Sequence, residues 1–312
     1  MLKIDLFDKI INRNGDFMEL LEAKTILSKV NYGDAWYGVD YNMNLYRGCP
    51  HGCIYCDSRS DCYHIENFDI VKGKENMLHI LESELSKKRL KGVVGIGAMS
   101  DTYNPMEIKY QQTRVALQLI SKYGFGVSID TKSDLILRDI DLLKEINSKN
   151  NVIVKFTITT PDDNLSKIIE PNVCVSSKRL EAIKKLNDNG IFAGIMMNPV
   201  LPFITDKEDD IKKLVELANE YGAKFIHTYM GMTLRENQRV YYFEKLDEKL
   251  PGLKEKYIKT YGDRYNCLVP NYKQLYKVFA DECDKYGILY KMNDIIRAYK
   301  KKSTNDEQIS LF

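Results

Sequence analysis

The sequence lacks any apolar run long enough to cross a membrane. Its longest apolar stretch, residues 191–204, is interrupted by Asn198 and two prolines, and it is shorter than the ~20 residues that a transmembrane helix needs. The first residues mix acidic with apolar side chains and lack the pattern of a secretory signal. These absences predict a soluble, cytoplasmic protein with no membrane partner.

An excess of either charge is also missing. Lys and Arg number 46 and Asp and Glu number 44 among 312 residues, which gives a net charge of +2. The basic stripe typical of nucleic-acid-binding proteins is therefore absent, although a nucleic-acid substrate is not excluded. The glycine-rich fingerprint of dinucleotide-binding proteins is missing too, because residues 95–101 lack its last glycine and no helix follows them directly.

Cysteine occurs seven times, an odd number, and three of the seven are crowded into one loop. This favours reduced thiols over a disulfide framework. The crowded residues are Cys49, Cys53 and Cys56, in the spacing C-x3-C-x2-C. Three thiolates can hold three corners of an iron–sulfur cube, whereas most clusters take four. One iron then stays open, as in catalytic metal sites. A zinc site or closed cluster with Cys62 or His51 as fourth ligand is the alternative.

With Tyr55 as the aromatic residue, the loop reads C-x3-C-x-aromatic-C and resembles the signature of the radical S-adenosylmethionine enzymes. Residues 44–56, N-L-Y-R-G-C-P-H-G-C-I-Y-C, resemble the cluster loop of the branch that includes spore photoproduct lyase. Five further blocks resemble the same branch in the same order: A-M-S-D-T-Y-N-P-M-E (98–107), D-T-K-S-D (130–134), T-I-T-T (157–160), E-P-N-V (170–173) and M-N-P-V-L-P (197–202). The resemblance extends over residues 40–205.

The apolar pattern predicts six strands that alternate with helices. The expected strands are residues 43–47, 93–98, 125–130, 152–160, 191–198 and 223–230, and the expected helices are 75–89, 111–123, 134–148, 178–189 and 206–221. This alternation is typical of a parallel sheet with right-handed crossovers, and six units are fewer than the eight that close a full barrel. We therefore expect an α/β fold, a partial (β/α)6 TIM-like barrel, which the resemblance also implies. A doubly wound sheet is the alternative.

Three regions are expected along the chain. Residues 1–40 form an N-terminal extension with an amphipathic helix over 15–30, residues 41–235 form the barrel, and residues 236–312 form a helical C-terminal extension. The many tyrosines of the C-terminal extension could stack bases. At helical spacing, they are more typical of a cap over the mouth of the barrel.

Polar residues follow the expected strands at the end where a barrel carries its active site. They are the three cysteines, Ser100 and Asp101, Lys132 and Ser133, Thr157 and Thr159, and Asn198. Strand 152–160 adds a second indication, because one of its alternating faces is wholly apolar and the other turns polar toward its end. We expect the apolar face to lie under helices and the polar face to look toward a cofactor.

The resemblance implies a 4Fe-4S cluster on Cys49, Cys53 and Cys56, with S-adenosylmethionine chelating the open iron. It also implies cofactor contacts for Tyr55 beside the adenine, for Ser100, Asp101 and Glu107 at polar groups of the methionine or ribose, for Lys132 at the carboxylate, and for Ser133, Thr157, Thr159 and Asn198. These residue types suit those groups, since carboxylates and hydroxyls pair with ammonium and ribose, and lysine pairs with a carboxylate. An electron donor such as flavodoxin or ferredoxin is implied as a partner.

Two further groups of residues carry expectations. Glu170 and Arg179 are expected to brace each other rather than contact the cofactor. His227 and Tyr229, with Arg235, could reach the substrate, although a lone histidine on a strand is more often a core residue.

The predicted function is that of a radical S-adenosylmethionine enzyme. It cleaves the cofactor reductively to a 5′-deoxyadenosyl radical and abstracts hydrogen from a nucleic acid, a peptide or a small molecule. Spore photoproduct lyases carry a hydrogen-donor cysteine where this chain has Met99, and a thioether has no S–H to give. Lyase-like DNA repair is therefore an alternative only, as is a non-catalytic zinc or iron–sulfur binding module.

Overall fold

A computed structural model of the chain describes residues 18–30 and 35–300. Its centre is a seven-stranded sheet in the order β2-β3-β5-β6-β7-β8-β9. All neighbours from β3 onward are parallel, and β2 is antiparallel to β3. The strands are β2 (Leu27–Lys29), β3 (Tyr41–Met43), β5 (Val93–Ile96), β6 (Gly126–Thr131), β7 (Val152–Thr157), β8 (Phe192–Met197) and β9 (Ile226–Thr228).

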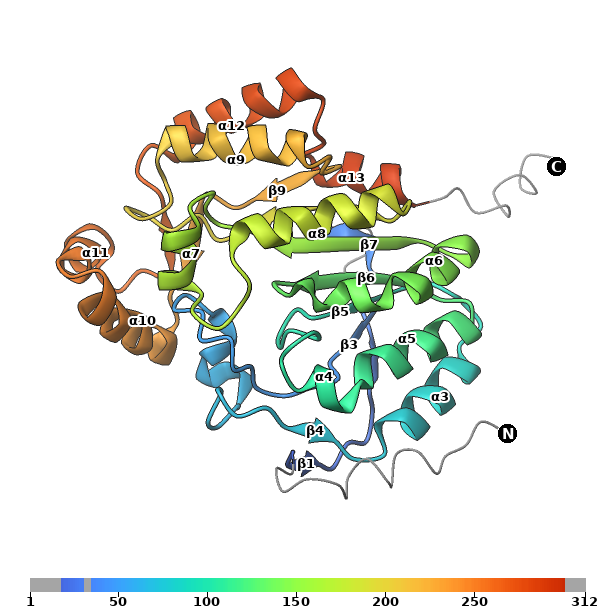
Figure 1. Cartoon of the computed structure of the whole chain (residues 1–312). Coiled ribbons are helices and arrows are strands. Elements are labelled where there is room, and N and C mark those ends of the chain that lie inside the picture. Colours follow the sequence, from blue (N-terminus) through green and yellow to red (C-terminus); the bar gives the residue numbers. More distant parts are fainter. Residues whose placement is uncertain (1–17, 31–34, 301–312) are drawn as a thin grey trace, which may run out of the picture.

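Five long helices follow the strands and cover one face of this curved sheet (Figure 1). They are α3 (Met77–Lys87), α5 (Gln112–Lys122), α6 (Ile140–Lys149), α8 (Ser176–Asp188) and α9 (Glu208–Glu220). Within the described ranges, the edge strands β2 and β9 do not pair with each other. The expectation of six parallel strands in an open, partial barrel is thus confirmed, and a closed barrel is not formed.

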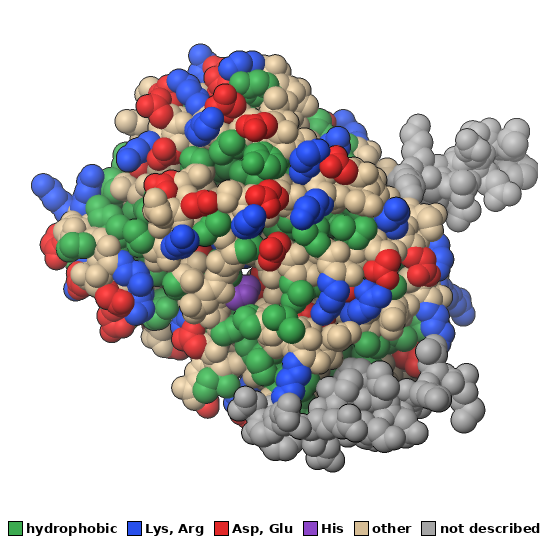
Figure 2. Space-filling model, viewed as in Figure 1, with side chains coloured by type: hydrophobic (Ala, Val, Ile, Leu, Met, Phe, Trp, Pro, Cys, Tyr) green, Lys and Arg blue, Asp and Glu red, His purple; other side chains and the backbone are tan. Residues whose placement is uncertain are grey.

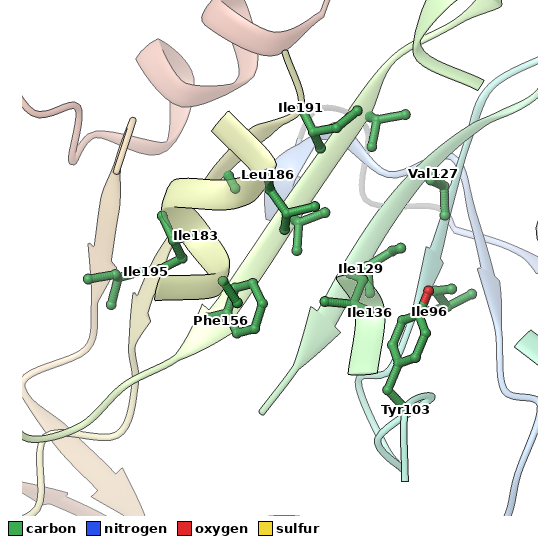
Figure 3. Packing of buried hydrophobic residues seen from close by; sticks show 14 of the residues in the cluster. Ile96, Tyr103, Val127, Ile129, Ile136, Phe156, Ile183, Leu186, Ile191 and Ile195 are labelled. Atoms are coloured by element: carbon green, nitrogen blue, oxygen red, sulfur yellow. The ribbon is translucent and has the colours of Figure 1, made fainter. Parts of the chain in front are cut away.

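The alternation in β7 separates two environments, as predicted. Val152, Val154 and Phe156 belong to the large apolar cluster under the helices, and Figure 3 shows Phe156 close to Ile183 and Leu186 of α8. Ile153 belongs to a second cluster on the inner face. The inner face of the barrel is therefore the face on which β7 turns polar toward its carboxyl end.

The amphipathic helix expected over residues 15–30 is wrong for the residues that the structure describes. Residues 18–30 contain β1 (Leu20–Leu21), which pairs with β4 (Gly73–Lys74), and the edge strand β2. The amides of Ile26 and Leu27 donate to the Glu84 carboxylate at 3.1 and 2.8 Å. Pairing with distant segments overrides the local helical pattern. Residues 15–17 lie outside the described residues.

The C-terminal helices are spread over three places rather than gathered as one cap. Helices α10 (Glu236–Lys249) and α11 (Leu253–Tyr261) lie beside the cysteine loop, and α12 (Tyr272–Tyr286) runs along α9 (Figure 1). Helix α13 (Met292–Tyr299) packs on α2 (Ala35–Gly38), and its Ile295 and Ile296 join the inner-face cluster at the amino ends of the strands. Only α10 and α11 are therefore near the predicted site.

Over the described residues, no helix has both the length and the apolar character that spanning a membrane requires.

Candidate active site

The cysteine loop follows β3 and is held by backbone hydrogen bonds to a second loop. The Arg47 amide donates to the Lys72 carbonyl at 2.9 Å, and the Cys49 amide donates to the Phe68 carbonyl at 2.7 Å. Gly48 between them has φ +80°, and a Cβ there would lie 2.3 Å from the Ile70 carbonyl oxygen. This position therefore needs glycine for both its conformation and its close approach.

Cys49, Cys53 and Cys56 all lie in this loop. Cys49 and Cys53 are buried and Cys56 is half-buried. Burial raises the pKa of the Cys49 thiol to about 12, and the Asp101 carboxylate adds to the shift. Burial also raises the pKa of Cys53, against the influence of the Lys132 cation. Buried thiols with raised pKa values bind metals as thiolates only by releasing their protons to the solvent.

A single metal ion has no ligand set among the described residues. No three His, Cys, Asp or Glu side chains in residues 18–30 and 35–300 converge closely enough for one ion. Cys62 is exposed, and the His51 ring lies 3.6 Å from the Asp101 carboxylate. A mononuclear zinc site needs four ligands around one point, whereas a cubane binds each cysteine to a different iron. The cluster and the zinc alternative both stay predictions.

Ser100 and Asp101 connect the loop after β5 to the cysteine loop and to β6. The Ser100 hydroxyl donates a short hydrogen bond to the Gly48 carbonyl. The Asp101 carboxylate accepts from the Thr131 hydroxyl at 2.8 Å and from the Lys132 amide at 2.7 Å. These two predicted residues thus fix the position of the cysteines and of Lys132 relative to the sheet.

Glu107 lies in a buried network of hydrogen bonds. Its carboxylate accepts from the Tyr46 hydroxyl, from the Thr113 amide at 3.0 Å and from the Arg138 guanidinium at 2.7 Å. Both carboxylate oxygens therefore have protein donors. Its predicted contact with the cofactor stays a prediction, and the described contacts give Glu107 a structural role at the start of α5.

Tyr55 lies over the predicted brace. Its hydroxyl donates a short hydrogen bond to the Glu170 carboxylate, which in turn pairs with the fully buried Arg179 guanidinium at 2.5 Å. Arg179 also donates to the Thr157 carbonyl at the end of β7, at 2.8 Å. The expected Glu170–Arg179 pair is confirmed, and it connects the aromatic residue of the cysteine motif to the inner wall of the barrel.

Lys132 extends from the end of β6 toward the cysteines. Its ammonium lies 5.8 Å from the centroid of the Tyr55 ring. Burial would lower the pKa of Lys132, but the neighbouring Cys53, Glu170 and Cys56 raise it above its ordinary value. A cation is thus held at the inner end of the loop, where it can receive an anionic group of a ligand.

The remaining predicted residues lie at the carboxyl ends of the strands. Thr157 and Thr159 are buried, and the Thr159 hydroxyl has no hydrogen-bond partner among the described residues. Asn198 follows β8 and is half-buried. The Ser133 hydroxyl accepts from the Leu135 amide at 3.3 Å and so caps the turn after β6. An unpartnered buried hydroxyl such as that of Thr159 fits a bound polar ligand.

A contribution of the C-terminal region to the cysteine loop was missed by the sequence analysis. The Gln238 amide in α10 donates to the Tyr55 carbonyl at 3.0 Å, and the Arg235 guanidinium pairs with Asp57 at 3.1 Å. Cys53 and Tyr55 also share an apolar cluster with Tyr257. No local pattern in the sequence reveals contacts between segments so far apart.

A cavity of about 520 Å³ opens beside the cysteine loop. Figure 2 shows a hollow with a histidine side chain at its base on this face. Among the residues lining the cavity are His51, Ser133, Arg138, Asn172 and Cys174. Of the predicted cofactor residues, only Ser133 lines it, and the lining residues belong to the segments that follow β3, β5, β6 and β7.

Comparison with known proteins gives three kinds of match. Residues 43–218 match the Radical SAM superfamily. An uncharacterised protein of Methanocaldococcus jannaschii is 35% identical over 193 residues, 61% of this chain and 71% of that protein. An uncharacterised protein of Mycobacterium tuberculosis is 29% identical over 266 residues, 83% of this chain and 77% of that protein.

Among solved structures, a point mutant of spore photoproduct lyase has a TM-score of 0.64 at 12% identity, and the alignment covers 86% of this chain and 79% of the lyase chain. The lyase complexed with dinucleoside spore photoproduct has a TM-score of 0.61 at 14% identity, with 80% and 74% covered. At these identities the likeness concerns the fold alone. A phage relative, from Pseudomonas phage M6, is 23% identical over 57% of this chain and 36% of its own length, and it is named Radical SAM Nalpha-GlyT isomerase.

Proposed function

This chain belongs to the Radical SAM superfamily, and from that premise we propose that it is an enzyme that cleaves S-adenosylmethionine reductively and abstracts hydrogen from a substrate. When bound, the cofactor and a reduced 4Fe-4S cluster supply a 5′-deoxyadenosyl radical. An electron donor such as flavodoxin or ferredoxin provides the electron. The residues of this chain hold the two groups and exclude other reactants.

The observation that carries the proposal is that three kinds of group follow the carboxyl ends of parallel strands of one sheet. The loop after β3 brings in three cysteines, the end of β6 brings in the Lys132 ammonium, and the end of β7 brings in the unpartnered Thr159 hydroxyl. Thiolates suit iron, an ammonium suits a carboxylate, and a hydroxyl suits a ribose or amino group. Together they match the chemical groups of a cluster with an amino-acid-derived ligand.

Each residue has a distinct part in the proposal. Cys49, Cys53 and Cys56 hold three irons, and Lys132 receives the carboxylate of the cofactor. Asp101 orients Lys132 through the backbone amide of that residue.

The inner wall contributes differently. Tyr55 is held by Glu170 and stands beside the adenine. Thr157, Thr159 and Asn198, which follow β7 and β8 or end them, would contact the cofactor. Burial around these groups keeps water away from a reactive species.

Lyase-like DNA repair is a weaker proposal for this chain. The half-buried Met99 stands where spore photoproduct lyases have a hydrogen-donor cysteine, and its thioether cannot return a hydrogen atom to a substrate radical. Nucleic acid is still the first substrate class to test, since a structure of similar fold is complexed with a dinucleoside. Peptides and small metabolites follow.

Anaerobic reconstitution tests the proposal. The full chain should bind about four irons, as a single cubane requires, and should release 5′-deoxyadenosine when S-adenosylmethionine and dithionite are added. Cys53→Ala should lose most of the iron, whereas Cys62→Ala, which changes an exposed cysteine of the same segment, should keep it. Stoichiometric zinc and no deoxyadenosine from the unchanged chain would instead indicate a binding module.

A further inference from the structure

Aromatic side chains bridge the gap between β3 and β9, the first and last parallel strands of the barrel. Helix α2 precedes β3 in the chain, yet the rings of Trp36 and Tyr37 lie 5.8 and 5.7 Å from the ring of His227 on β9. Ile226 next to His227 belongs to the outer cluster under the helices, so His227 points to the inner face. The three rings therefore join the first and last parallel strands from inside, where strand pairing does not.

Two polar atoms in this group are buried without a hydrogen-bond partner among the described residues. They are the Tyr37 hydroxyl and Nδ1 of His227. Nδ1 of a neutral histidine ring is an acceptor when the other ring nitrogen carries the proton. Buried polar groups nearly always have a partner in native proteins. A hydroxyl and a ring nitrogen on two rings whose centroids lie 5.7 Å apart thus indicate a ligand with a complementary pair of groups.

Trp36 lies over both of these residues. Its indole contacts the Tyr37 and His227 rings edge-on, at interplanar angles of 82° and 86°, while 45% of the side chain is exposed. The backbone of Trp36 has φ 51° and ψ 72°, and that of Tyr37 has φ 58° and ψ 20°. Such left-handed conformations are costly for non-glycine residues and gather at ligand clamps and switch regions.

Tyr37, in contrast to Trp36, is held on every side. Its ring lies 4.5 Å from the Lys155 ammonium, which pairs with Asp130 at 3.1 Å and donates to Ser128 at 2.8 Å. The Tyr37 carbonyl accepts a short hydrogen bond from the Tyr299 hydroxyl. Trp36 is therefore the member of the group that can move without breaking a described hydrogen bond or ion pair.

We propose that Trp36 is a movable cover over a substrate subsite that binds a planar lactam heterocycle, the ring type of a nucleobase. When the indole swings out, the ring takes its place, its carbonyl accepts from the Tyr37 hydroxyl, and its neighbouring N–H donates to Nδ1 of His227. The ring of a phenylalanine or tyrosine side chain has no such edge, so a peptide is the less suitable occupant. This inference rests on the proposed function only in taking the ring to be part of the substrate.

The chain carries its own reporter for this subsite, because Trp36 is its only tryptophan. Titration of the full chain with uridine should change the tryptophan emission in a saturable way. N3-methyluridine keeps the ring but lacks the N–H, and N-acetyltyrosinamide has an aromatic ring without the lactam edge. Both should bind at least about tenfold more weakly than uridine, the loss that one buried hydrogen bond confers.

A matched pair of variants tests the residues. Tyr37→Phe removes only the unpartnered hydroxyl and should weaken uridine binding about tenfold. Tyr276→Phe removes a hydroxyl from an exposed tyrosine of α12 and should leave the binding unchanged. If Tyr37→Phe unfolds the chain, the comparison of uridine with N3-methyluridine on the unchanged chain still decides between the outcomes.

The titration is made before and after anaerobic reconstitution, with S-adenosylmethionine present in the second case. Uridine binding in either state, with the stated discrimination, supports the subsite. No emission change in both states, or equal binding of uridine and N-acetyltyrosinamide, would overturn it. Release of 5′-deoxyadenosine without added substrate is measured separately, so failure of the subsite and failure of the proposed function give different results.

Discussion

The Glu170 carboxylate lies 2.5 Å from the Arg179 guanidinium, and neither side chain is exposed. Glu170 also accepts the Tyr55 hydroxyl, and Arg179 also donates to the carbonyls of Thr157 and Cys174. This pair therefore connects the cysteine loop, the end of β7 and the segment before α8. It fixes the cysteine motif against the barrel from inside.

Removing one member of this pair should strongly destabilise the fold. Glu170→Ala leaves the Arg179 charge buried without its partner, and such changes cost about 3–5 kcal/mol. The free energy of unfolding, measured with a chemical denaturant, should fall by that amount. Asp188→Ala breaks the exposed pair with Lys184 and should cost at most about 1 kcal/mol. Equal effects of the two variants would contradict the structural role of Glu170.

Lys132 should govern affinity for S-adenosylmethionine without affecting the cluster. Lys132→Met removes the cation that faces the cysteines and Tyr55, and loss of a charged hydrogen bond of about 1.5–3 kcal/mol weakens binding by about tenfold or more. Equilibrium dialysis with labelled cofactor measures this, and iron analysis should show an unchanged cluster. Lys144→Met, at an exposed position of α6, is the control. Unchanged affinity in Lys132→Met would assign the carboxylate to another residue.

The stability of the chain should fall on acidification partly because of His227. Burial, aided by the Lys155 cation, lowers the pKa of His227 below its ordinary value, against a hydrogen bond to the Tyr290 carbonyl. The unfolded chain therefore binds more protons, so the stability present above pH ~6.5 is lost as the pH falls through the folded-state pKa.

Denaturant unfolding at pH 7 and pH 5 should show a smaller loss for His227→Gln than for the unchanged chain. His79→Gln, at an exposed histidine of α3, should keep the full loss. An identical loss in all three chains would show that His227 is not the responsible group.

Tyr257 should stabilise the contact of α11 with α10 and with the segment after β8. Its hydroxyl donates to the Pro202 carbonyl at 2.8 Å and lies 2.9 Å from the Tyr242 hydroxyl, and the side chain is fully buried. Tyr257→Phe leaves these groups without a partner and should cost about 1–3 kcal/mol. Thermal unfolding of the chain with and without the reconstituted cluster measures this loss of stability. No loss in either state would show that α11 is not coupled to the core.

Much of this architecture could be predicted because it depends on local pattern. In β7, an apolar face and a face that turns polar toward its end indicated both the strand and its two environments, since side chains alternate along a strand. The polar residues after the strands could be placed together because parallel strands end at the same edge. The Glu170–Arg179 pair could be expected because the two oppositely charged residues flank one short segment of the sequence.

The features that were missed depend on contacts between distant segments. Strand β2 forms because it pairs with β3 and because the backbone amides at its start donate hydrogen bonds to the Glu84 carboxylate. Its own residues fit a helix. The contact of Trp36 with His227 joins a residue that precedes the first parallel strand, β3, to a residue on the last one, β9. The C-terminal helices could be recognised by their periodicity, but the surfaces that they cover could not, because periodicity identifies an apolar face and not its partner.

The most direct test of the account is electron–nuclear double resonance spectroscopy on the reduced, reconstituted chain with isotope-labelled S-adenosylmethionine. If three cysteines leave one iron open, labelled nitrogen and oxygen of the amino and carboxylate groups should show hyperfine coupling to the cluster, and Cys62→Ala should give the same spectrum. Absence of coupling, with a spectrum unchanged by the cofactor, would mean that a protein side chain occupies the fourth iron, and this would contradict the proposed chemistry.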